Sequence, residues 1–507
     1  MSRNPLWETV VSFAECDSGR TALVSSRGRM TYGEVILSAS MLGDAIESID
    51  SSVGAIVYDG LCREDEVLLQ LACAKLAVPF VPVPAGARSV DICGMWARTL
   101  FVGPGLDIRR IFAPSPGRIS PYPPSGCMYV LGTSGSTSMP GFCAIESDSV
   151  ISMCIEVRSR LGISPGRRWL AFHSGRFDFS IWEVWGALLS GGSAVLIEED
   201  ERLEFDFIAE QISAEGCEVV SLLPSVLFAL LRSSSHSIWQ GVSWLVLGGE
   251  KPILDDCREV YELSNRQALV ASLYGLTEAC VHVATRVVFR PSALVGRENP
   301  LLDSREPHWI GAPLRSFDFL VRDSDGNWSR QGQGELWISG APVVREYLNG
   351  VRPDRFRDIE GRRWFFTGDV GSIEGGEICV LGRRGDTLKV RGKRIARQRL
   401  EYLLSSAHPA LVSAHVLEVV SHGGIQDWAI YLEWTGGLQR FVSDQHLLSR
   451  IDCVLGEEFG RPMLILFHSQ RLPRLASGKV DLPHLQALLQ RHVDDGLRGI
   501  VALRSEY

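Results

Sequence analysis

Apolar and polar positions along this chain follow two periods, which predict alternating helices and strands. Between residues 31 and 49, apolar side chains recur every three to four positions, the spacing of one helix face. Short apolar runs follow at 55–60 and 80–84, and a helical pattern at 64–77 separates them. Since such runs are typical of strands buried on both faces, this order predicts a βαβ unit with a parallel sheet. The apolar face assigned to the first helix comprises Val35, Leu37, Met41, Leu42, Ala45 and Ile46.

The alternation continues through the middle of the chain, so a second βα-layered region is expected there. Its pattern gives way to a β-rich stretch over 282–380, in which 334–340 is the clearest strand. The expected helices of the second region are 180–190 and 204–215, and its expected strands are 193–198, 218–224 and 244–249.

A smaller α/β region follows the β-rich stretch, where the composition turns basic near residue 381. It ends in an amphipathic helix at 482–494. The fold class is therefore α/β, with two βα-layered subdomains and a β-rich subdomain in a large unit. We place the boundary so that the large unit covers 1–381 and the small unit covers 382–507.

Composition excludes several classes of protein. The 507 residues carry a net charge of −9, which argues against a nucleic-acid binder. The N-terminus lacks the apolar core of a signal peptide, and no apolar run is long and uninterrupted enough for a membrane span. The twelve cysteines follow no disulfide or metal-ligand spacing, so reduced, packed thiols and a cytoplasmic location are expected.

The most informative candidate for chemistry is a glycine-rich loop. An apolar strand at 128–131 runs into Thr133, Ser134, Gly135, Ser136 and Thr137. Because Gly135 has no side chain, backbone N–H groups and several hydroxyls can approach an anion closely. The glycine, lysine and Ser/Thr ending of a Walker loop is missing, so this loop is not one.

Seven patches of the sequence, taken in order, resemble the adenylate-forming superfamily. The likeness is to amino-acid-activating adenylation domains of nonribosomal peptide synthetases, and it extends over nearly the whole chain. Each patch alone is a weak signal, whereas seven in the right order are a strong one. The patches are ALVSSRGRMTYGEV (22–35), YVLGTSGST (129–137), FDFSIWE (177–183), YGLTE (274–278), GELWISG (334–340) with FTGDVG (366–371), LGRRGDTLKVRGKRI (381–395) and LPRLASGKVD (472–481).

This resemblance implies an acyl-adenylate synthetase fold that uses ATP and Mg²⁺. Tyr274 would stack on adenine, Asp369 would accept hydrogen bonds from the ribose hydroxyls with Arg383 nearby, and Glu278 would hold Mg²⁺. Lys479 would be the catalytic residue, reaching the substrate carboxylate and the bridging oxygens. The implied nucleotide-binding set is Thr133, Ser134, Gly135, Ser136, Thr137, Gly249, Tyr274, Gly275, Thr277, Asp369, Arg383 and Lys479.

The resemblance also implies a substrate. An aspartate at the place of Asp178 pairs with the α-ammonium group of an amino acid, and the alternative interpretation of Asp178 is a helix N-cap. The remaining pocket residues resemble those of threonine-activating domains, although an amide side chain is expected where Ser221 stands. His282 offers an imidazole to a substrate hydroxyl, or else is a packed core histidine. The implied pocket is Asp178, Phe179, Trp182, Ser221, Val246, Gly248, Leu273, Val281 and His282.

The resemblance further implies a mobile small unit and a protein partner. The small unit would turn about a hinge at Arg384, Gly385 and Asp386, and the acyl group would pass to the phosphopantetheine thiol of a carrier protein. No Gly-Gly-x-Ser carrier sequence follows Lys479, so we expect a stand-alone enzyme that loads a separate carrier protein. A small MbtH-like accessory protein is a further expected partner, whereas no nucleic acid and no membrane is expected.

Two departures from the family pattern keep other functions open. Residues 138–142 read SMPGF where the family has two lysines, and Gly385 stands where the hinge has an aspartate or lysine. One alternative is an acyl- or aryl-coenzyme A ligase acting on an acid without an amino group. The other is a degenerate nucleotide-binding protein that mediates interactions without turnover.

Overall fold

The computed structural model describes most of the large N-terminal region and parts of the C-terminal region. Its described residues are 4–83, 92–93, 96, 98–110, 126–133, 141–233, 236–291, 309–384, 387–390, 393–397, 400–401, 404, 411–420, 426–434, 449, 451, 455, 462–468, 480–497 and 499–503.

The chain forms two compact units. The first consists of Met1–Leu320, Trp337–Thr367 and Ile373–Ile378. The second consists of Val321–Leu336, Gly368–Ser372 and Cys379–Tyr507.

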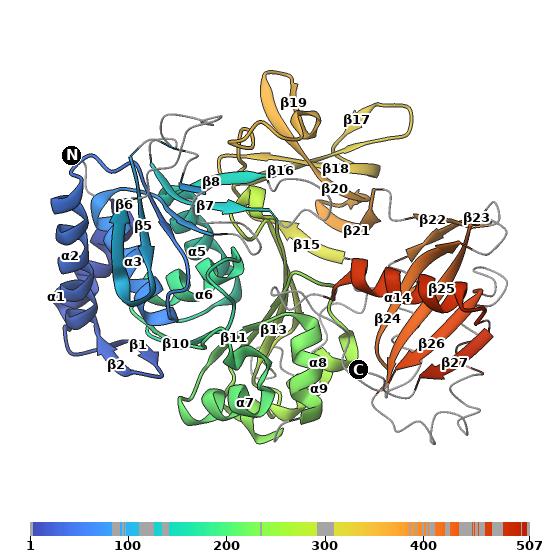
Figure 1. Ribbon diagram of the computed structural model, residues 1–507, viewed down its shortest axis with the longest axis horizontal. Coiled ribbons are helices and arrows are strands. Elements are labelled where there is room, and N and C mark those ends of the chain that lie inside the picture. Colours follow the sequence, from blue (N-terminus) through green and yellow to red (C-terminus); the bar gives the residue numbers. More distant parts are fainter. Residues whose placement is uncertain are drawn as a thin grey trace. The chain divides into compact units, whose positions relative to one another are not determined.

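The first unit contains a six-stranded sheet near the N-terminus, with the order β6-β5-β3-β4-β7-β8. Four of its strands are parallel, and β6 and β8 are antiparallel edge strands. The helices α1, α2 and α3 pack against one another beside this sheet (Figure 1). The bounds are α1 Pro5–Cys16, α2 Tyr32–Ile49, α3 Arg63–Leu76, β3 Ala55–Tyr58, β4 Phe80–Pro82, β5 Thr99–Gly103, β6 Asp107–Arg110, β7 Cys127–Gly132 and β8 Phe142–Glu146, with a 3₁₀ turn η1 at Pro104–Leu106.

The helix α2 begins as its sequence predicts but buries a different face. Thr31 caps its N-terminus in a capping box with Glu34. Val35 and Ile46 are buried, whereas Leu37 and Met41 of the expected apolar face are 62% and 65% exposed. The assignment of Leu37, Met41 and Ala45, which is also exposed, was wrong, because at 100° per residue these three lie on sides of the helix that face away from the buried row.

A second sheet of the first unit carries the middle of the chain. Its strands follow the order β2-β1-β10-β9-β11-β12-β13-β14-β15, and β1, β10, β9, β11, β12 and β13 are parallel. The bounds are β1 Thr21–Ser25, β2 Gly28–Thr31, β9 Arg168–Ala171, β10 Ser193–Leu196, β11 Val219–Leu222, β12 Trp244–Gly248, β13 Leu269–Tyr274, β14 Ala284–Phe289 and β15 Trp309–Pro313.

Helices connect the parallel strands of this sheet and bury its faces. One large core includes Leu170, Val220, Leu245 and Val270 from the strands and Trp239 from a connecting turn. The expected βαβ alternation is therefore confirmed. The bounds are α5 Ser147–Leu161, α6 Phe179–Leu188, α7 Phe205–Ala214, α8 Pro224–Ser233 and α9 Leu254–Leu263, with 3₁₀ turns η2 Glu201–Leu203, η3 His236–Gly241 and η4 Thr277–Ala279.

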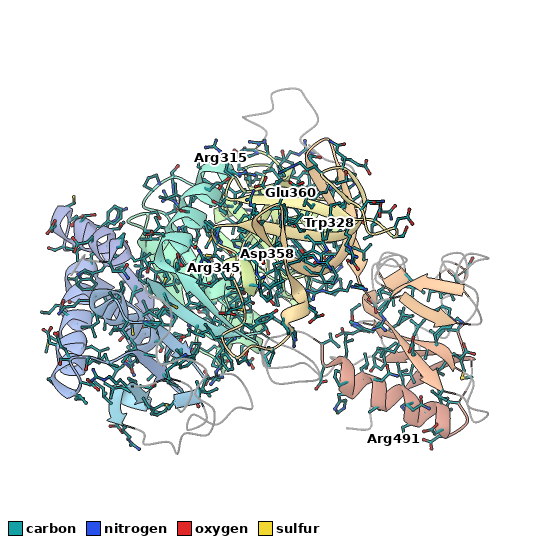
Figure 2. The ribbon with its side chains drawn as sticks, turned by 90° about the horizontal axis from the view of Figure 1, so that it is seen from above. Arg315, Trp328, Arg345, Asp358, Glu360 and Arg491 are labelled. Carbon is teal, nitrogen blue, oxygen red and sulfur yellow. The ribbon has the colours of Figure 1, made fainter. Side chains whose placement is uncertain are left out.

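The β-rich stretch contains the strand order β17-β16-β18-β20-β21, with β19 paired to β20. Near one hairpin, Arg322 lies 5.6 Å from the ring centre of Trp328, which Figure 2 labels. At another, Arg363 donates to Asp358 at 3.0 Å. The bounds are β16 Phe317–Arg322, β17 Trp328–Ser329, β18 Gly332–Gly340, β19 Phe356–Ile359, β20 Arg362–Glu374 and β21 Glu377–Arg383, with a 3₁₀ turn η5 at Pro353–Arg355.

The second unit ends in a four-stranded sheet, β24-β25-β26-β27, with α14 on one face (Figure 1). Leu485, Leu489 and Val493 of α14 are fully buried against this sheet. The predicted amphipathic helix is confirmed with the same bounds, and Arg491 marks its polar side in Figure 2. The bounds are β22 Thr387–Val390, β23 Lys393–Ala396, β24 Leu411–Val420, β25 Gln426–Trp434, β26 Leu464–His468, β27 Gly499–Leu503 and α14 Leu482–Asp494.

Two further expectations concern the chain as a whole. Over the part that the structure describes, no helix combines the length and the apolar character needed to cross a membrane. The eleven cysteines in the described ranges are free thiols, and nine of them are buried. Burial raises the pKa of several of these thiols, for example that of Cys154 to about 12, so they stay protonated at neutral pH.

Candidate active site

The two ends of the glycine-rich loop are joined by backbone and hydroxyl contacts. The N–H of Thr133 donates to the carbonyl of Gly141 at 2.8 Å, and the N–H of Gly141 donates to the Thr133 hydroxyl at 3.1 Å. Thr133 is buried, so its side chain anchors the base of the loop. Four predicted phosphate-binding residues lie outside the described residues: Ser134, Gly135, Ser136 and Thr137.

A tyrosine that the sequence analysis missed connects this loop to the expected metal ligand. The ring of Tyr347 lies so close to Gly141 that a Cβ at that position would be 2.4 Å away from it. Its hydroxyl donates to Glu278 Oε1 at 2.5 Å. Burial, with the Glu278 carboxylate second, raises the pKa of Tyr347, so the phenol keeps the proton that it donates. No motif in the sequence marks Tyr347, since a lone tyrosine after a strand carries no spacing signal.

Glu278 has the character that a magnesium ligand needs. It lies on η4, it is buried, and its backbone carbonyl accepts a hydrogen bond from Val344 N–H at 2.9 Å. Mg²⁺ is usually bound by one or two protein carboxylates together with substrate phosphates. Glu278 is linked through Tyr347 and Gly141 to the base of the glycine-rich loop, so it fits the expected role of a magnesium ligand.

Strand register brings the expected pocket floor together. Ser221 of β11 is paired with Val246 of β12, and Gly248 of β12 is paired with Leu273 of β13. Because side chains alternate along a strand, Val246 and Gly248 share one face of the sheet. The same register places Ser221 and Leu273 on that face, so four predicted pocket residues form one surface.

The helix α6 covers this surface with aromatic rings. Trp182 donates its indole N–H to the Ser221 hydroxyl at 3.2 Å. The ring of Phe179 lies against Gly248, where a Cβ would be 3.2 Å from the ring. His282 packs edge-on to both rings, with centroids 5.2 Å from Phe179 and 5.5 Å from Trp182.

A strained turn carries Val281 and His282, the last two residues of the expected pocket. Cys280 and Val281 both have positive φ, 54° and 68°, and His282 N–H donates to the Cys280 carbonyl at 2.8 Å. Such a tight turn around a β-branched residue is unfavourable. Gly275 makes room for it, since a Cβ there would lie 1.4 Å from the Val281 carbonyl oxygen. The predicted nucleotide residue Gly275 therefore also shapes the pocket.

His282 is fully enclosed and electrically neutral. Burial, with His173 second, lowers its pKa to about 3. Its Nε2 atom is buried and has no hydrogen-bond partner among the described residues. A buried imidazole nitrogen of this kind requires a partner, which a polar ligand group can supply.

Asp178 occupies the N-cap position of α6 but makes no capping hydrogen bond. That geometry removes the reason for interpreting it as a helix cap. Burial raises the pKa of Tyr129, Cys143 and Cys280, and the nearby Asp178 carboxylate adds to each of these shifts.

The other predicted nucleotide residues of this unit lie on loops that follow strands of the second sheet. Tyr274 ends β13 and is half-buried, and Thr277 begins η4. Gly249 has a φ of 76° and lies against Leu223, where a Cβ would be 2.8 Å from the side chain.

The second unit holds the expected ribose contact. Asp369 on β20 is buried, and Arg383 Nε lies 3.1 Å from its Oδ1. Arg384 of the expected hinge pairs with Glu335 at 2.8 Å. The remaining predicted residues, Gly385, Asp386 and Lys479, lie outside the described residues.

Comparison with known proteins agrees with this geometry. Residues 105–348 match the model of the AMP-binding enzyme family. The chain is 30% identical over 329 residues to a dimodular nonribosomal peptide synthase of Bacillus subtilis, covering 62% of this chain and 13% of that protein. It is 28% identical over 508 residues to the non-ribosomal peptide synthetase CmlP of Streptomyces venezuelae, covering 93% and 48%. The chain thus spans less than half the length of these curated relatives.

Solved structures share the fold over nearly the whole chain. ATP-bound MatB from Rhodopseudomonas palustris superposes with a TM-score of 0.75 at 17% identity, covering 97% of this chain and 100% of that one. O-succinylbenzoate coenzyme A synthetase MenE from Bacillus subtilis, in complex with AMP, superposes with a TM-score of 0.72 at 19% sequence identity. The match covers 98% of this chain and 99% of that one. The predicted fold class, that of an acyl-adenylate synthetase, is therefore confirmed.

Proposed function

We propose that this chain is an adenylate-forming ligase that activates an amino acid, with L-threonine as its substrate. The proposal is supported by the contacts among Phe179, Trp182, Ser221 and His282, whose imidazole is neutral, and by the carboxylate of Asp178 directly before α6. The similarity to nonribosomal peptide synthetases supports an amino acid as the acid that is activated.

In the first step, a carboxylate oxygen of threonine attacks the α-phosphorus of ATP. The bond from that phosphorus to the bridging oxygen breaks, and pyrophosphate leaves with the electron pair. The loop based on Thr133 would hold the phosphates, Tyr274 would stack on adenine, and Lys479 would stabilise charge on the bridging oxygens. Bound Mg²⁺, held by Glu278, would neutralise charge on the phosphate oxygens.

Selection of threonine would use both ends of the pocket. Asp178 would pair with the α-ammonium group, because charge-assisted hydrogen bonds between an ammonium group and a carboxylate are strong. The Nε2 atom of His282 would exchange a hydrogen bond with the substrate hydroxyl. Valine would leave that nitrogen unpaired, whereas serine would lose only a methyl contact, so valine should be rejected more strongly.

In the second step, the acyl group would pass to the phosphopantetheine thiol of a separate carrier protein. The thiol sulfur attacks the acyl carbon, AMP leaves, and the thiol proton is released. The similarity to nonribosomal peptide synthetases supports a carrier protein as the acceptor. A small MbtH-like accessory protein is included in the proposal as a partner, and the hinge is proposed at Arg384, Gly385 and Asp386.

ATP–pyrophosphate exchange across the twenty amino acids, with several aryl and short-chain acids, tests the proposal. We expect exchange to peak at L-threonine and to be lost in Lys479→Ala. Exchange that peaks at an acid without an amino group, and discharge of its adenylate by coenzyme A, would favour an acyl-coenzyme A ligase. The shared fold with a coenzyme A synthetase makes that ligase the second candidate. Silence across the panel, with an accessory protein present, would contradict both.

A further inference from the structure

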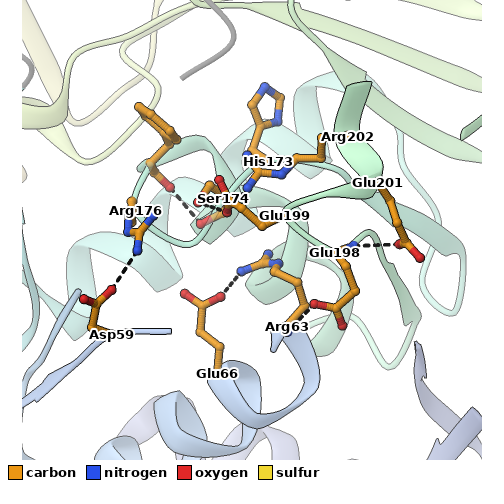
Figure 3. A network of polar contacts seen from close by, with 12 residues as sticks. Asp59, Arg63, Glu66, His173, Ser174, Arg176, Glu198, Glu199, Glu201 and Arg202 are labelled. Atoms are coloured by element: carbon orange, nitrogen blue, oxygen red, sulfur yellow. Dashed lines mark hydrogen bonds and ion pairs between the residues drawn. The ribbon is translucent and has the colours of Figure 1, made fainter. Parts of the chain in front are cut away.

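A cluster of charged side chains holds the segment that leads into Asp178 (Figure 3). We name residues 172–178, between β9 and α6, the pocket loop. Four carboxylates contact it from α6, from the loop after β3, from α3 and from the loop after β10. We name them the charged clasp: Glu183, Asp59, Glu66 and Glu199.

Glu183 fixes the start of the pocket loop. One of its oxygens accepts the backbone N–H of His173 at 2.9 Å, and the other lies 2.7 Å from His173 Nδ1. Glu183 is completely buried, so this pair cannot be exchanged for water. The His173 ring in turn packs on the pocket residue Phe179, with centroids 4.4 Å apart.

Glu66 sets how closely the pocket loop approaches α3. A Cβ at Gly175 would lie only 1.3 Å from Glu66 Oε1. The carboxylate has little freedom to move away, because Tyr58 and Arg63 both donate to it and all three side chains are buried. Burial, followed by the Glu66 charge, raises the pKa of Tyr58, so its hydroxyl remains a donor.

Two contacts at the edge of the cluster complete the clasp. Ser174 donates its hydroxyl to Glu199 at 2.8 Å, and Arg176 donates to Asp59 at 2.7 Å (Figure 3). Both carboxylates are partly exposed, with side chains 51% exposed in Glu199 and 39% in Asp59. These two outer contacts therefore stabilise the position of the pocket loop less than the buried contacts do.

Hydrogen bonds between near neighbours connect the pocket loop to the start of α6, where Asp178 lies. Phe177 N–H donates to the Ser174 carbonyl at 2.9 Å, and Ile181 N–H donates to the Asp178 carbonyl at 2.9 Å. Ser180 binds the Phe177 carbonyl through its hydroxyl at 2.7 Å. A shift of the loop at Gly175 would therefore move the carboxylate of Asp178.

We infer that Glu66 and Glu183 are positioning residues for recognition of the substrate's α-ammonium group, acting through Gly175 and His173 on Asp178. This inference rests on the proposed function. Burying several charges beside a pocket is costly, and an apolar contact would serve the fold as well. A rigid charged frame instead holds Asp178 at the distance that distinguishes an ammonium group from a hydroxyl.

The sharpest test is Gly175→Ala, which pushes the loop away from Glu66. We expect kcat/KM for threonine in pyrophosphate exchange to fall by about 10- to 100-fold, with the loss in KM for threonine and not in KM for ATP. The preference for threonine over 2,3-dihydroxybutyrate, which has a hydroxyl in place of the ammonium group, should shrink. Gly241→Ala is the matched control, because Gly241 has open space around its Cα and should leave both constants unchanged.

A substitution at Glu66 should restore the preference for the ammonium group that Gly175→Ala weakens. Glu66→Asp shortens the carboxylate by one methylene, so the double variant Gly175→Ala with Glu66→Asp should recover most of the ammonium preference. Should Gly175→Ala fail to fold, Glu199→Gln and Asp59→Asn weaken the partly exposed contacts, and about a 2- to 5-fold smaller ammonium preference is expected.

The outcomes separate the inference from the proposed function. Wild-type exchange that peaks at threonine, with an ammonium preference unchanged in all these variants, would overturn the inference alone. A fall in thermal stability with equal effects on ATP and threonine would also overturn it, since the cluster would then serve only the fold. Wild-type protein that activates no amino acid would overturn the proposed function and the inference together.

Discussion

The proposed amino-acid side and the proposed phosphate side of the first unit are held in place by different means. Asp178 is the last residue of the pocket loop, and four carboxylates contact this loop. Two of them, Glu66 and Glu183, are buried. Glu278 on the phosphate side receives one side-chain hydrogen bond, from Tyr347, among the contacts established for the described residues. Groups that must discriminate between similar ligands benefit from a rigid frame, whereas one hydrogen bond can be enough to orient a carboxylate that binds a metal ion. Substitutions on the two sides should therefore change different constants.

The largest effect is expected at the amino-acid side, for Asp178→Ala. Removing the proposed partner of the ammonium group should lower kcat/KM for threonine by about 10²-fold or more. KM for ATP should remain close to that of the wild type. Pyrophosphate exchange with both substrates varied measures the two constants, and Asp178→Asn, which keeps the size without the charge, is the companion variant. Unchanged kinetics in both would place the ammonium group elsewhere.

The second effect is on the pH dependence of stability, through His282. Its pKa is about 3 in the folded chain and near 6.5 when unfolded. Between these values the unfolded chain takes up a proton that the folded chain does not, so stability falls as pH falls from about 6.5 toward 3. The slope is about 1.4 kcal/mol per pH unit at most.

Replacing His282 by glutamine should remove this slope. Urea unfolding of the wild type and of His282→Gln at several pH values between 6 and 4 isolates the contribution, because other titrating groups are common to both. The free energy of unfolding should fall more steeply with decreasing pH in the wild type. Parallel curves would mean that the imidazole is not held neutral.

The third effect belongs to the phosphate side, for Tyr347→Phe. Losing the hydroxyl that donates to Glu278 should weaken Mg²⁺ affinity by about 10-fold, as expected for a residue that orients a metal ligand. Calorimetric binding of ATP at increasing Mg²⁺ concentrations measures the change.

Tyr261→Phe is the control for that experiment. The Tyr261 hydroxyl is buried but has no hydrogen-bond partner among the described residues, so its loss should not affect Mg²⁺ binding. Equal shifts in the two variants would show that Tyr347 supports the fold and not the metal ligand.

Much of the fold could be predicted from the sequence, and the site only in part. Periodicity located the helices 179–188 and 482–494 to within a residue or two, because their apolar faces are long and regular. Motifs named Asp178 and His282 but not the turn that carries His282. Its strain appears only in φ values, and the room at Gly275 only in three dimensions.

The contacts that hold the site were the part least accessible from the sequence. Glu183 lies inside a recognised motif, yet nothing in its spacing shows that it binds His173. Tyr347 and Glu66 lie 69 and more than 100 residues from the groups that they orient. Long-range pairs of this kind depend on the tertiary fold, and neither motifs nor periodicity along the chain reveal them.

The smallest effect is expected in the second unit, for Arg383→Gln. Arg383 pairs with Asp369 at 3.1 Å, but its side chain is 54% exposed, so solvent screens the pair. We expect KM for ATP to rise by about 2- to 3-fold, with KM for threonine unchanged. Arg363→Gln, which removes an arginine of similar exposure from its pair with Asp358, is the control and should change neither constant. A tenfold or larger rise in KM for ATP would show that Arg383 contacts the nucleotide itself. Binding of ATP would then depend on Arg383 about as strongly as binding of threonine is expected to depend on Asp178.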